Sequence, residues 1–381
     1  MKIVIYGLTI TSSWGNGHAT TYRSLCRALA RRGHQVHFIE KDVEWYRSNR
    51  DLPRPEFCKL QLYETWNQSV LLPSQDADVV MVGSYFPDAI TVSHALFEAG
   101  CGPVLFYDID TPITLAELCS HGRTDYLEAE LIPHYAAYLS FSGGPALYMI
   151  EHYFGSSWAV GFYCSVDPAL YARTEAQDLY SCDLSYLGTY APDRQPQLMK
   201  FMDGAARLLP SARFIVAGPQ YPEGLCWHNN VKRIDHVAPP QHPAFYSSSR
   251  FTLNLTRKDM VAVGFSPSVR LFEAAACETA ILSDAWAGLE EFLTPGEEIL
   301  LPHDEYEVAS ILRQMPHSEA ERIGRAARRR ILEQHTADHR AVEFESIVES
   351  LSQGKSQRSS RSSASEWRHH SGVSIASRSK G

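Results

Sequence analysis

Apolar positions along the chain form two alternating patterns, short clusters typical of buried strands and longer repeats typical of amphipathic helices. Residues 2–8 form a cluster of β-branched and aromatic side chains. A helical repeat follows and ends at Arg31, Arg32 and Gly33, because basic residues and a glycine are typical of a helix C-terminus. Residues 35–40 form the next strand pattern. The chain is therefore predicted to open with a βαβ unit.

The same alternation of strand and helix patterns continues through both halves of the chain, as far as residue 284. The segments that carry it are 78–99, 102–118, 136–155, a short strand and turn in 156–171, and then 184–209, 212–222, 250–260 and 266–284. Repeated βα units imply parallel sheets that are covered by helices on both faces. The predicted fold class is α/β, with two doubly wound Rossmann-like domains that face each other across a cleft. In such sheets the ligand lies beyond the carboxyl ends of the strands, so both sets of loops should meet there.

A glycine loop joins the first strand to the first helix and carries Gly15, Gly17 and His18. Free backbone N–H groups at a helix start can bind phosphate. A dinucleotide motif would need its glycines next to the strand, and Glu40 would then hold a ribose. Thr20 fills the place of the third glycine, which disfavours that interpretation. The alternatives are a loop that closes on a substrate and a plain structural turn.

Composition restricts the compartment and the partners. The eight cysteines have no paired short spacings, so they are expected to be reduced core residues and not zinc ligands or disulfides. No run of eighteen apolar residues is present, and the chain begins directly with a strand pattern, so we expect a cytoplasmic protein without a transmembrane segment. The last stretch, 353–381, has six Lys or Arg against one Glu, so the total of −9 leaves −14 on residues 1–352. Such a body should repel nucleic acid.

Residues 264–301, GFSPSVRLFEAAACETAILSDAWAGLEEFLTPGEEILL, resemble the nucleotide-sugar signature of two-domain GT-B glycosyltransferases. The likeness is to the CgeB-like group, which is related to spore-maturation proteins and to the glycosyl transferases of group 1. It extends in order through LSYLGTY, ARFIVAGP and DEYEVASILRQM, and it covers residues 160–350 well and the first half more loosely.

The resemblance assigns a role to each predicted segment. Residues 1–165 would be the Rossmann-like domain on the acceptor side, and 166–335 the domain that binds the nucleotide-sugar donor. Residues 336–352 are predicted to form a helix that crosses back to the first domain. The Ser- and Arg-rich segment 353–381 has few residues to bury and is predicted to be disordered.

Three residues of the signature are expected on one helix face, since Ser266, Arg270 and Glu273 are spaced i, i+4 and i+7. Val269 and Phe272 are predicted to line the opposite, core face. The resemblance implies that Glu273 binds the nucleotide ribose. It also implies that basic residues hold the leaving diphosphate. The full predicted donor set is Gly15, Gly17, Gly188, Arg257, Lys258, Ser266, Arg270 and Glu273.

Two positions depart from the family pattern. Phe265 stands where many relatives that retain anomeric configuration have a second glutamate, so retention is in doubt. Glu278 replaces a usual glycine at a helix C-terminus, where the dipole disfavours a carboxylate. Either that helix end is exposed or Glu278 has a partner.

Catalysis needs positive charge against the departing diphosphate and, for inversion, a base near the acceptor. The candidates are His18 in the glycine loop and Asp108 or Asp110 at the end of a strand. Asp108 and Asp110 also match the D-x-D pattern of the metal-dependent glycosyltransferase fold. Because the resemblance is to a fold whose members bind diphosphate without metal, no metal or other cofactor is expected.

The leading hypothesis is a glycosyltransferase that moves a sugar from a nucleotide-diphosphate donor, a UDP-sugar, to an unknown acceptor hydroxyl. Two alternatives stay open. One is a catalytically degenerate protein that keeps nucleotide binding as a scaffold, motivated by the two departures. The other is a nucleotide-sugar epimerase, which can share the same two-domain architecture.

Overall fold

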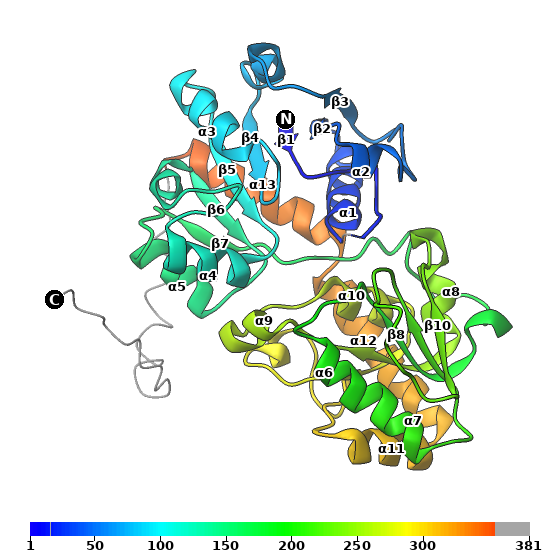
Figure 1. Cartoon of the computed structure of the whole chain (residues 1–381). Helices are drawn as coiled ribbons and strands as arrows, with labels where there is room; N and C mark the ends of the chain where they lie inside the picture. The colour runs from blue at the N-terminus through cyan, green and yellow to red at the C-terminus, as the bar shows by residue number, and fades with distance from the viewer. Residues whose placement is uncertain (16, 355–381) are drawn as a thin grey trace.

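The computed structural model describes residues 1–15 and 17–354 and arranges them around two parallel β-sheets (Figure 1). The first sheet has the strand order β3-β2-β1-β4-β5-β6-β7 and the second the order β10-β9-β8-β11-β12. The strands are β1 Lys2–Tyr6, β2 Gln35–Lys41, β3 Lys59–Tyr63, β4 Val79–Gly83, β5 Val104–Asp108, β6 Ala137–Ser140, β7 Ala159–Gly161, β8 Cys182–Leu187, β9 Phe214–Ala217, β10 Val231–Ile234, β11 Ser249–Asn254 and β12 Ala280–Ser283. The predicted α/β class with two Rossmann-like sheets is confirmed.

Helices cover both faces of each sheet, as the continuous apolar strands require. The helices are α1 His18–Arg31, α2 Glu44–Arg47, α3 Ala89–Glu98, α4 Thr111–His121, α5 Pro145–His152, α6 Gln195–Leu198, α7 Gly204–Leu208, α8 His242–Ser247, α9 Lys258–Val263, α10 Val269–Ala276, α11 Glu305–Gln314, α12 His317–Gln334 and α13 Ala337–Ser352. On the first sheet, α1 and α13 share one core with Phe38, whereas α3, α4 and α5 share the other with Val80. On the second sheet, α8 and α10 pack on one face, α6, α7 and α11 pack on the other, and α12 contributes residues to both cores.

The sequence analysis missed two strands, and both lie at the edge of a sheet. β3 has the sequence KLQLY and β10 the sequence VKRI, so polar residues interrupt their apolar pattern. An edge strand is exposed on one side and tolerates such residues, which removes the signal that identifies central strands. The predicted helix 195–209 is also interrupted, by a π-helical stretch at Met199–Asp203.

Helix α13 lies against α1, so the end of the described chain returns to the first sheet (Figure 1). Arg31 pairs with Asp338 at 2.9 Å, and Arg32 pairs with Glu345 at 2.6 Å. The fully buried ring of Phe344 adds an apolar contact. The predicted division at 165/166 and 335/336 stays a prediction, and all but the first two residues of the predicted tail, 353–381, lie outside the described residues.

The two chain crossings between the sheets run side by side. The N–H of Val166 donates to the carbonyl of His335 at 3.2 Å, and the N–H of Ala337 donates to the carbonyl of Val166 at 2.8 Å. These two backbone hydrogen bonds join the connection at Val166 to the connection at residues 335–337, and we call the joined segments the strap. Across residues 1–15 and 17–354, no helix is long and apolar enough to cross a membrane.

Candidate functional site

A pocket of about 150 Å³ lies between loops that come from both sheets. The glycine loop after β1 and the start of α1 form one wall. Loops after β8, β9 and β10, with the first turns of α10, form the other. The lining residues are Ser13, Gly15, Gly17, Thr20, Leu187, Gly188, Thr189, Gly218, Pro219, His236, Val237, Pro239, His242, Tyr246, Val269, Arg270 and Glu273. Five of the eight predicted donor residues therefore meet in one place: Gly15, Gly17, Gly188, Arg270 and Glu273.

A larger cavity, of about 880 Å³, lies at the amino ends of β1, β2 and β3, where it is lined by Lys2, Gln35 and Lys59 among others. None of the predicted site residues reaches it. Ligands of open parallel sheets bind beyond the carboxyl ends of the strands. The smaller pocket is therefore the candidate functional site.

The glycine loop is fixed by the buried carboxylate of Glu40 at the end of β2. One carboxylate oxygen accepts from the hydroxyls of Thr9 and Thr11, at 3.0 and 2.6 Å. The other accepts from the N–H groups of Ile10 and Thr11, at 2.7 and 3.1 Å. Since all four bonds go to the loop, Glu40 is not free to hold a ribose, and the dinucleotide interpretation is wrong.

A second group of contacts, made by Arg23 and Asp51, fixes the part of the loop that is nearer to the pocket. Arg23 of α1 donates from Nε to the carbonyl of Ile10 at 2.8 Å and from both terminal nitrogens to Asp51. Asp51 in turn accepts from the N–H and hydroxyl of Ser13, at 2.9 and 2.8 Å. Burial raises the pKa of Asp51, but the bonds from Arg23 and Ser13 outweigh it and hold the pKa at about 2. The pair therefore stays charged and keeps Ser13 at the wall of the pocket.

Arg270 provides the positive charge of the opposite wall. Its guanidinium lies over the ring of Tyr186 at 5.5 Å and donates to the carbonyl of Leu255 at 3.4 Å. A Cβ at Gly188 would lie 3.0 Å from an Arg270 terminal nitrogen, so a side chain there would crowd the guanidinium. Gly218, at φ +139, approaches the Gly188 carbonyl so closely that a Cβ would be 2.0 Å from it. Two glycines thus keep backbone groups open beside Arg270.

Glu273 lies one helical turn beyond Arg270 in a pocket of aromatic side chains. It is 4% exposed, and the hydroxyl of Tyr246 donates to its carboxylate at 3.4 Å. His242 lies 3.9 Å away, and Tyr171 also contacts the carboxylate. Burial raises the pKa of Glu273 to about 7, while Tyr171, Arg270 and Tyr246 oppose the rise. The carboxyl is thus poised to ionise when donors approach it.

The start of α10 differs from the prediction. The helix begins at Val269, so Ser266 lies before it and does not share a helix face with Arg270. The Ser266 hydroxyl is buried and bonds instead to the hydroxyl of Ser142, at 2.6 Å, and to the carbonyl of Gly264. Val269 packs against the core, partly buried, and also lines the pocket, whereas Phe272 is fully buried in the core as predicted. Pro267 and the extended Ser268 delay the helix by two residues.

Phe265 joins the two halves of the molecule. It has φ +49, and its ring fills the space that side chains at Gly144 and Gly288 would need. Its carbonyl accepts from the N–H of Gly143, in the turn after β6, at 3.0 Å. Phe265 therefore provides an apolar contact between the halves.

Glu278, the second departure, has partners. Arg328 donates to its carboxylate at 2.9 Å, and Arg173 lies 3.6 Å away. Its φ of +60 ends α10 in the left-handed conformation that a glycine would adopt more easily. The two guanidinium groups offset the unfavourable helix dipole.

The remaining catalytic and basic candidates form a separate cluster beside the pocket. His18 is the first residue of α1 and packs edge-on against Tyr85, with ring centroids 5.3 Å apart. Asp110 lies 3.9 Å from Arg257, which also lies 3.7 Å from Asp193. The exposed Lys258 begins α9. Both halves therefore contribute charge here, although none of these side chains lines the pocket itself.

His18 is 8% exposed, and within the part of the chain that the structure describes its Nδ1 has no hydrogen-bond partner. Burial lowers the pKa of the imidazole, and the charge of Asp110 opposes this effect. The ring is therefore neutral at neutral pH, with one nitrogen able to accept a proton.

Asp108 does not reach the cleft. It is fully buried, and its carboxylate accepts from Tyr138 at 2.6 Å and from Thr114 at 2.9 Å. Burial raises its pKa to about 6 despite these bonds. One oxygen also accepts from the N–H of Asp110, so both carboxylate oxygens of Asp108 have donors within the fold. A catalytic role for Asp108 stays a prediction.

Several lining residues were missed by the sequence analysis: Pro219, His236, Val237, His242 and Tyr246. They follow β9 and the unrecognised β10, so their place at the carboxyl edge was hidden. The ring of His236 packs at a tilt against Trp14 of the glycine loop, with ring centroids 4.7 Å apart, so the two halves are in contact at this side of the pocket. Recognising β10 would have placed His236 and Val237, which follow it, at the carboxyl edge of the sheet. Pro219 follows β9, a strand that the sequence analysis did identify.

Comparison with known proteins agrees with this geometry. Residues 194–346 match the family model described as glycosyl transferase-like, and no curated protein sequence matches the chain. Sucrose-phosphate synthase from Thermosynechococcus elongatus is 14% identical and superposes with a TM-score of 0.68, over 93% of this chain and 100% of its own. HepE from Anabaena, in complex with UDP and glucose, is 13% identical with a TM-score of 0.69, over 92% and 100%. The E. coli trehalose-6-phosphate structure bound with UDP-2-fluoro glucose is 11% identical with a TM-score of 0.65, over 91% and 99%. The predicted GT-B fold is confirmed.

The Glu40 anchor gives a testable expectation. Replacing Glu40 with Ala removes four acceptor bonds and leaves the buried N–H groups of Ile10 and Thr11 unpaired. We expect the free energy of unfolding to fall by about 2–4 kcal/mol. Urea denaturation followed by circular dichroism measures the change. Glu56→Ala, which removes an exposed carboxylate from the same half, should change it little. Equal stability of the two variants would contradict the anchoring role.

Proposed function

We propose that this protein is a glycosyltransferase that moves a sugar from a nucleoside-diphosphate donor, a UDP-sugar, to an acceptor hydroxyl. One observation carries the proposal. Gly188, Arg270 and Glu273 from the second half meet Gly15 and Gly17 from the first half at a single pocket beyond the carboxyl ends of both sheets. The similar GT-B structures that hold UDP or a UDP-sugar support the choice of donor. The CgeB-like group is the subgroup we propose.

The pocket suits each part of a nucleoside diphosphate. The Glu273 carboxylate would accept from the two ribose hydroxyls, in place of its weak bond from Tyr246. The Arg270 guanidinium and the open backbone at Gly188 would bind the diphosphate, because a planar fork of donors matches phosphate oxygens. Gly15 and Gly17 would let the loop backbone approach the same charge from the other half.

The reaction places negative charge on the donor phosphate. The acceptor oxygen forms a bond to the anomeric carbon, the bond from that carbon to the diphosphate oxygen breaks, and its electron pair leaves with UDP. Arg270 would neutralise that charge, and Arg257 and Lys258, in the separate cluster beside the pocket, would assist. These three cations support the proposal that the diphosphate departs without a metal ion or other cofactor.

The acceptor hydroxyl must lose its proton during the transfer. His18 is the proposed base, since its imidazole is neutral and one nitrogen lacks a partner among the described residues. Asp110 would stabilise the imidazolium that forms. Asp108 has no direct part in this scheme.

Eight unpaired cysteines, four of them buried, suit a reducing compartment, so we propose that the reaction takes place in the cytoplasm. Incubation with UDP-glucose, alone and with candidate acceptors, separates the proposed function from its alternatives. A transferase releases UDP and transfers glucose to an acceptor or to water. An epimerase forms a new UDP-sugar without acceptor, and a scaffold protein returns the donor unchanged. Either of the last two results would overturn the proposal.

The role of Arg270 predicts a difference between two ligands. Arg270→Ala should weaken binding of UDP by about 1.5–3 kcal/mol and leave uridine binding nearly unchanged, because the guanidinium acts on phosphate charge. Calorimetric titration with both ligands measures this. Arg325→Ala, on the exposed side of α12, is the matched control. An equal loss for UDP and uridine would mean that Arg270 supports the fold of the pocket instead.

The role of His18 predicts a difference between turnover and binding. His18→Ala should slow UDP release from UDP-glucose, with water as acceptor, by about 10²–10⁴-fold, while UDP affinity is largely kept. His303→Ala removes an exposed histidine elsewhere and should have no effect. Unchanged turnover in His18→Ala would contradict the proposed role of His18 as the base and would leave it only its packing against Tyr85.

A further inference from the structure

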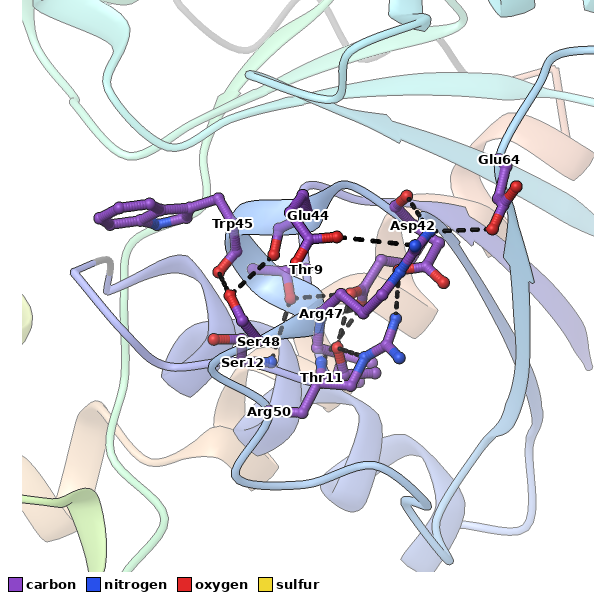
Figure 2. Close-up of polar contacts among 12 residues, drawn as sticks. Thr9, Thr11, Ser12, Asp42, Glu44, Trp45, Arg47, Ser48, Arg50 and Glu64 are labelled. Carbon is purple, nitrogen blue, oxygen red and sulfur yellow. Dashed lines mark hydrogen bonds and ion pairs between the residues drawn. The ribbon is translucent and has the colours of Figure 1, made fainter.

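Trp45 is an exposed tryptophan on α2, the short helix that follows β2. Its side chain is 52% exposed, and it is the only tryptophan among the exposed large apolar side chains of residues 1–15 and 17–354. Tryptophan has the largest apolar surface of any side chain and is usually covered. Figure 2 shows its indole projecting away from the polar side chains that gather on the other side of α2.

The backbone that carries Trp45 is held firmly. Its carbonyl accepts from the side-chain amide of Asn49 at 2.9 Å, and the hydroxyl of Ser48 donates to the carbonyl of Glu44 at 2.9 Å. Arg47 of the same helix pairs with Asp42 at 3.1 Å and with Glu64 of the segment after β3 at 2.9 Å. Because the backbone of this helix is already held in place, binding of a ligand to the exposed indole would cost little conformational entropy.

The charged groups on and around α2 indicate the chemistry of that ligand. Three carboxylates, Asp42, Glu44 and Glu64, stand with two guanidinium groups, Arg47 and Arg50, and all are linked in one network. A net excess of carboxylate disfavours phosphate-rich partners. Glu44, 79% exposed, adds a strong hydrogen-bond acceptor beside the indole in sequence.

This patch is connected to the donor pocket through the chain that follows α2. The Ser12 hydroxyl donates to the carbonyl of Asn49 at 2.7 Å, and Asp51 accepts from Ser13, which lines the pocket. The N–H groups of Asp51 and Leu52 both donate to the carbonyl of Thr11. The segment that carries Trp45 therefore forms the outer side of the glycine loop, on the half of the molecule opposite Arg270 and Glu273.

We infer that Trp45 is a stacking platform for a saccharide ring of the acceptor, so that the acceptor is a glycan or a glycoside. This inference rests on the proposed function. A pyranose presents a face of C–H groups to the electron-rich face of an indole, while its hydroxyls point outward to carboxylates such as Glu44. The acceptor is held by Trp45 through a ring beyond the one that reacts, and the glycine loop lies between the platform and the donor.

The test uses the full chain labelled with 5-fluorotryptophan and followed by ¹⁹F NMR. The seven tryptophans give separate signals, and Trp45→Phe identifies the signal of Trp45. Maltotriose, cellotriose, chitotriose and xylotriose are titrated in turn, and UDP is titrated into a separate sample. We expect at least one trisaccharide to shift the Trp45 signal in a saturable way. In calorimetry with that sugar, Trp45→Ala should bind about two- to tenfold more weakly than the wild type. Tyr306→Ala, which removes an exposed aromatic ring from α11, should bind as the wild type does.

The outcomes separate the inference from the function on which it rests. If UDP binds and none of the trisaccharides moves the Trp45 signal, the platform is wrong and the proposed function stands. If a trisaccharide moves that signal and UDP does not bind, the saccharide site stands and the glycosyltransferase proposal fails. A shift of the Trp45 signal with phosphatidylcholine vesicles, but with no sugar, would show that the indole contacts lipid and would overturn the inference.

Discussion

The buried carboxylate of Glu40 is the constraint on which the geometry of the site depends. A loop of eleven residues between β1 and α1 contains two glycines that line the pocket and would have many conformations in isolation. Four hydrogen bonds from Thr9, Ile10 and Thr11 to Glu40 select one of them. Because these donors are buried, loss of the carboxylate would leave them unpaired, so the loop and the end of β2 are fixed together. Arg23 and Asp51 extend the same anchoring to Ser13 at the pocket wall.

A site formed by loops from two sheets also requires contacts that fix the position of one sheet relative to the other. The strap at Val166 and Ala337 and the packing of α13 on α1 hold one side. The contact of Phe265 with the turn at Gly143 and Gly144 holds the other. The pocket between the halves has a volume of about 150 Å³, below the usual range for ligand sites of about 300–1,000 Å³.

The sequence predicted the fold well because central parallel strands are continuous apolar runs, and these runs are visible without a structure. It missed β3 and β10 because edge strands carry polar residues, and with β10 it missed His236, Val237 and His242 at the pocket. Arg270 and Glu273 were placed correctly in the pocket, since spacing on one helix fixes their common face. Ser266 was misplaced because a Pro-Ser pair delays the helix start, and Asp108 because a motif of two acids does not reveal which one is buried. Only the tertiary structure shows whether a carboxylate is hydrogen-bonded inside the core, as Asp108 is, or lines a pocket, as Glu273 does.

The pH dependence of UDP affinity, compared between the wild type and Glu273→Gln, tests the central claim that this pocket binds the nucleotide most directly. The pKa of Glu273 is raised to about 7, and only the ionised form accepts charge-assisted bonds from the ribose. Wild-type affinity should therefore rise relative to the variant as the pH increases through about 7, by about 1.5–3 kcal/mol at the high end. The phosphate of UDP titrates near pH 6 in both proteins, so the difference between them isolates the carboxyl. A difference that does not change with pH, or equal affinity of the two proteins at every pH, would contradict the account.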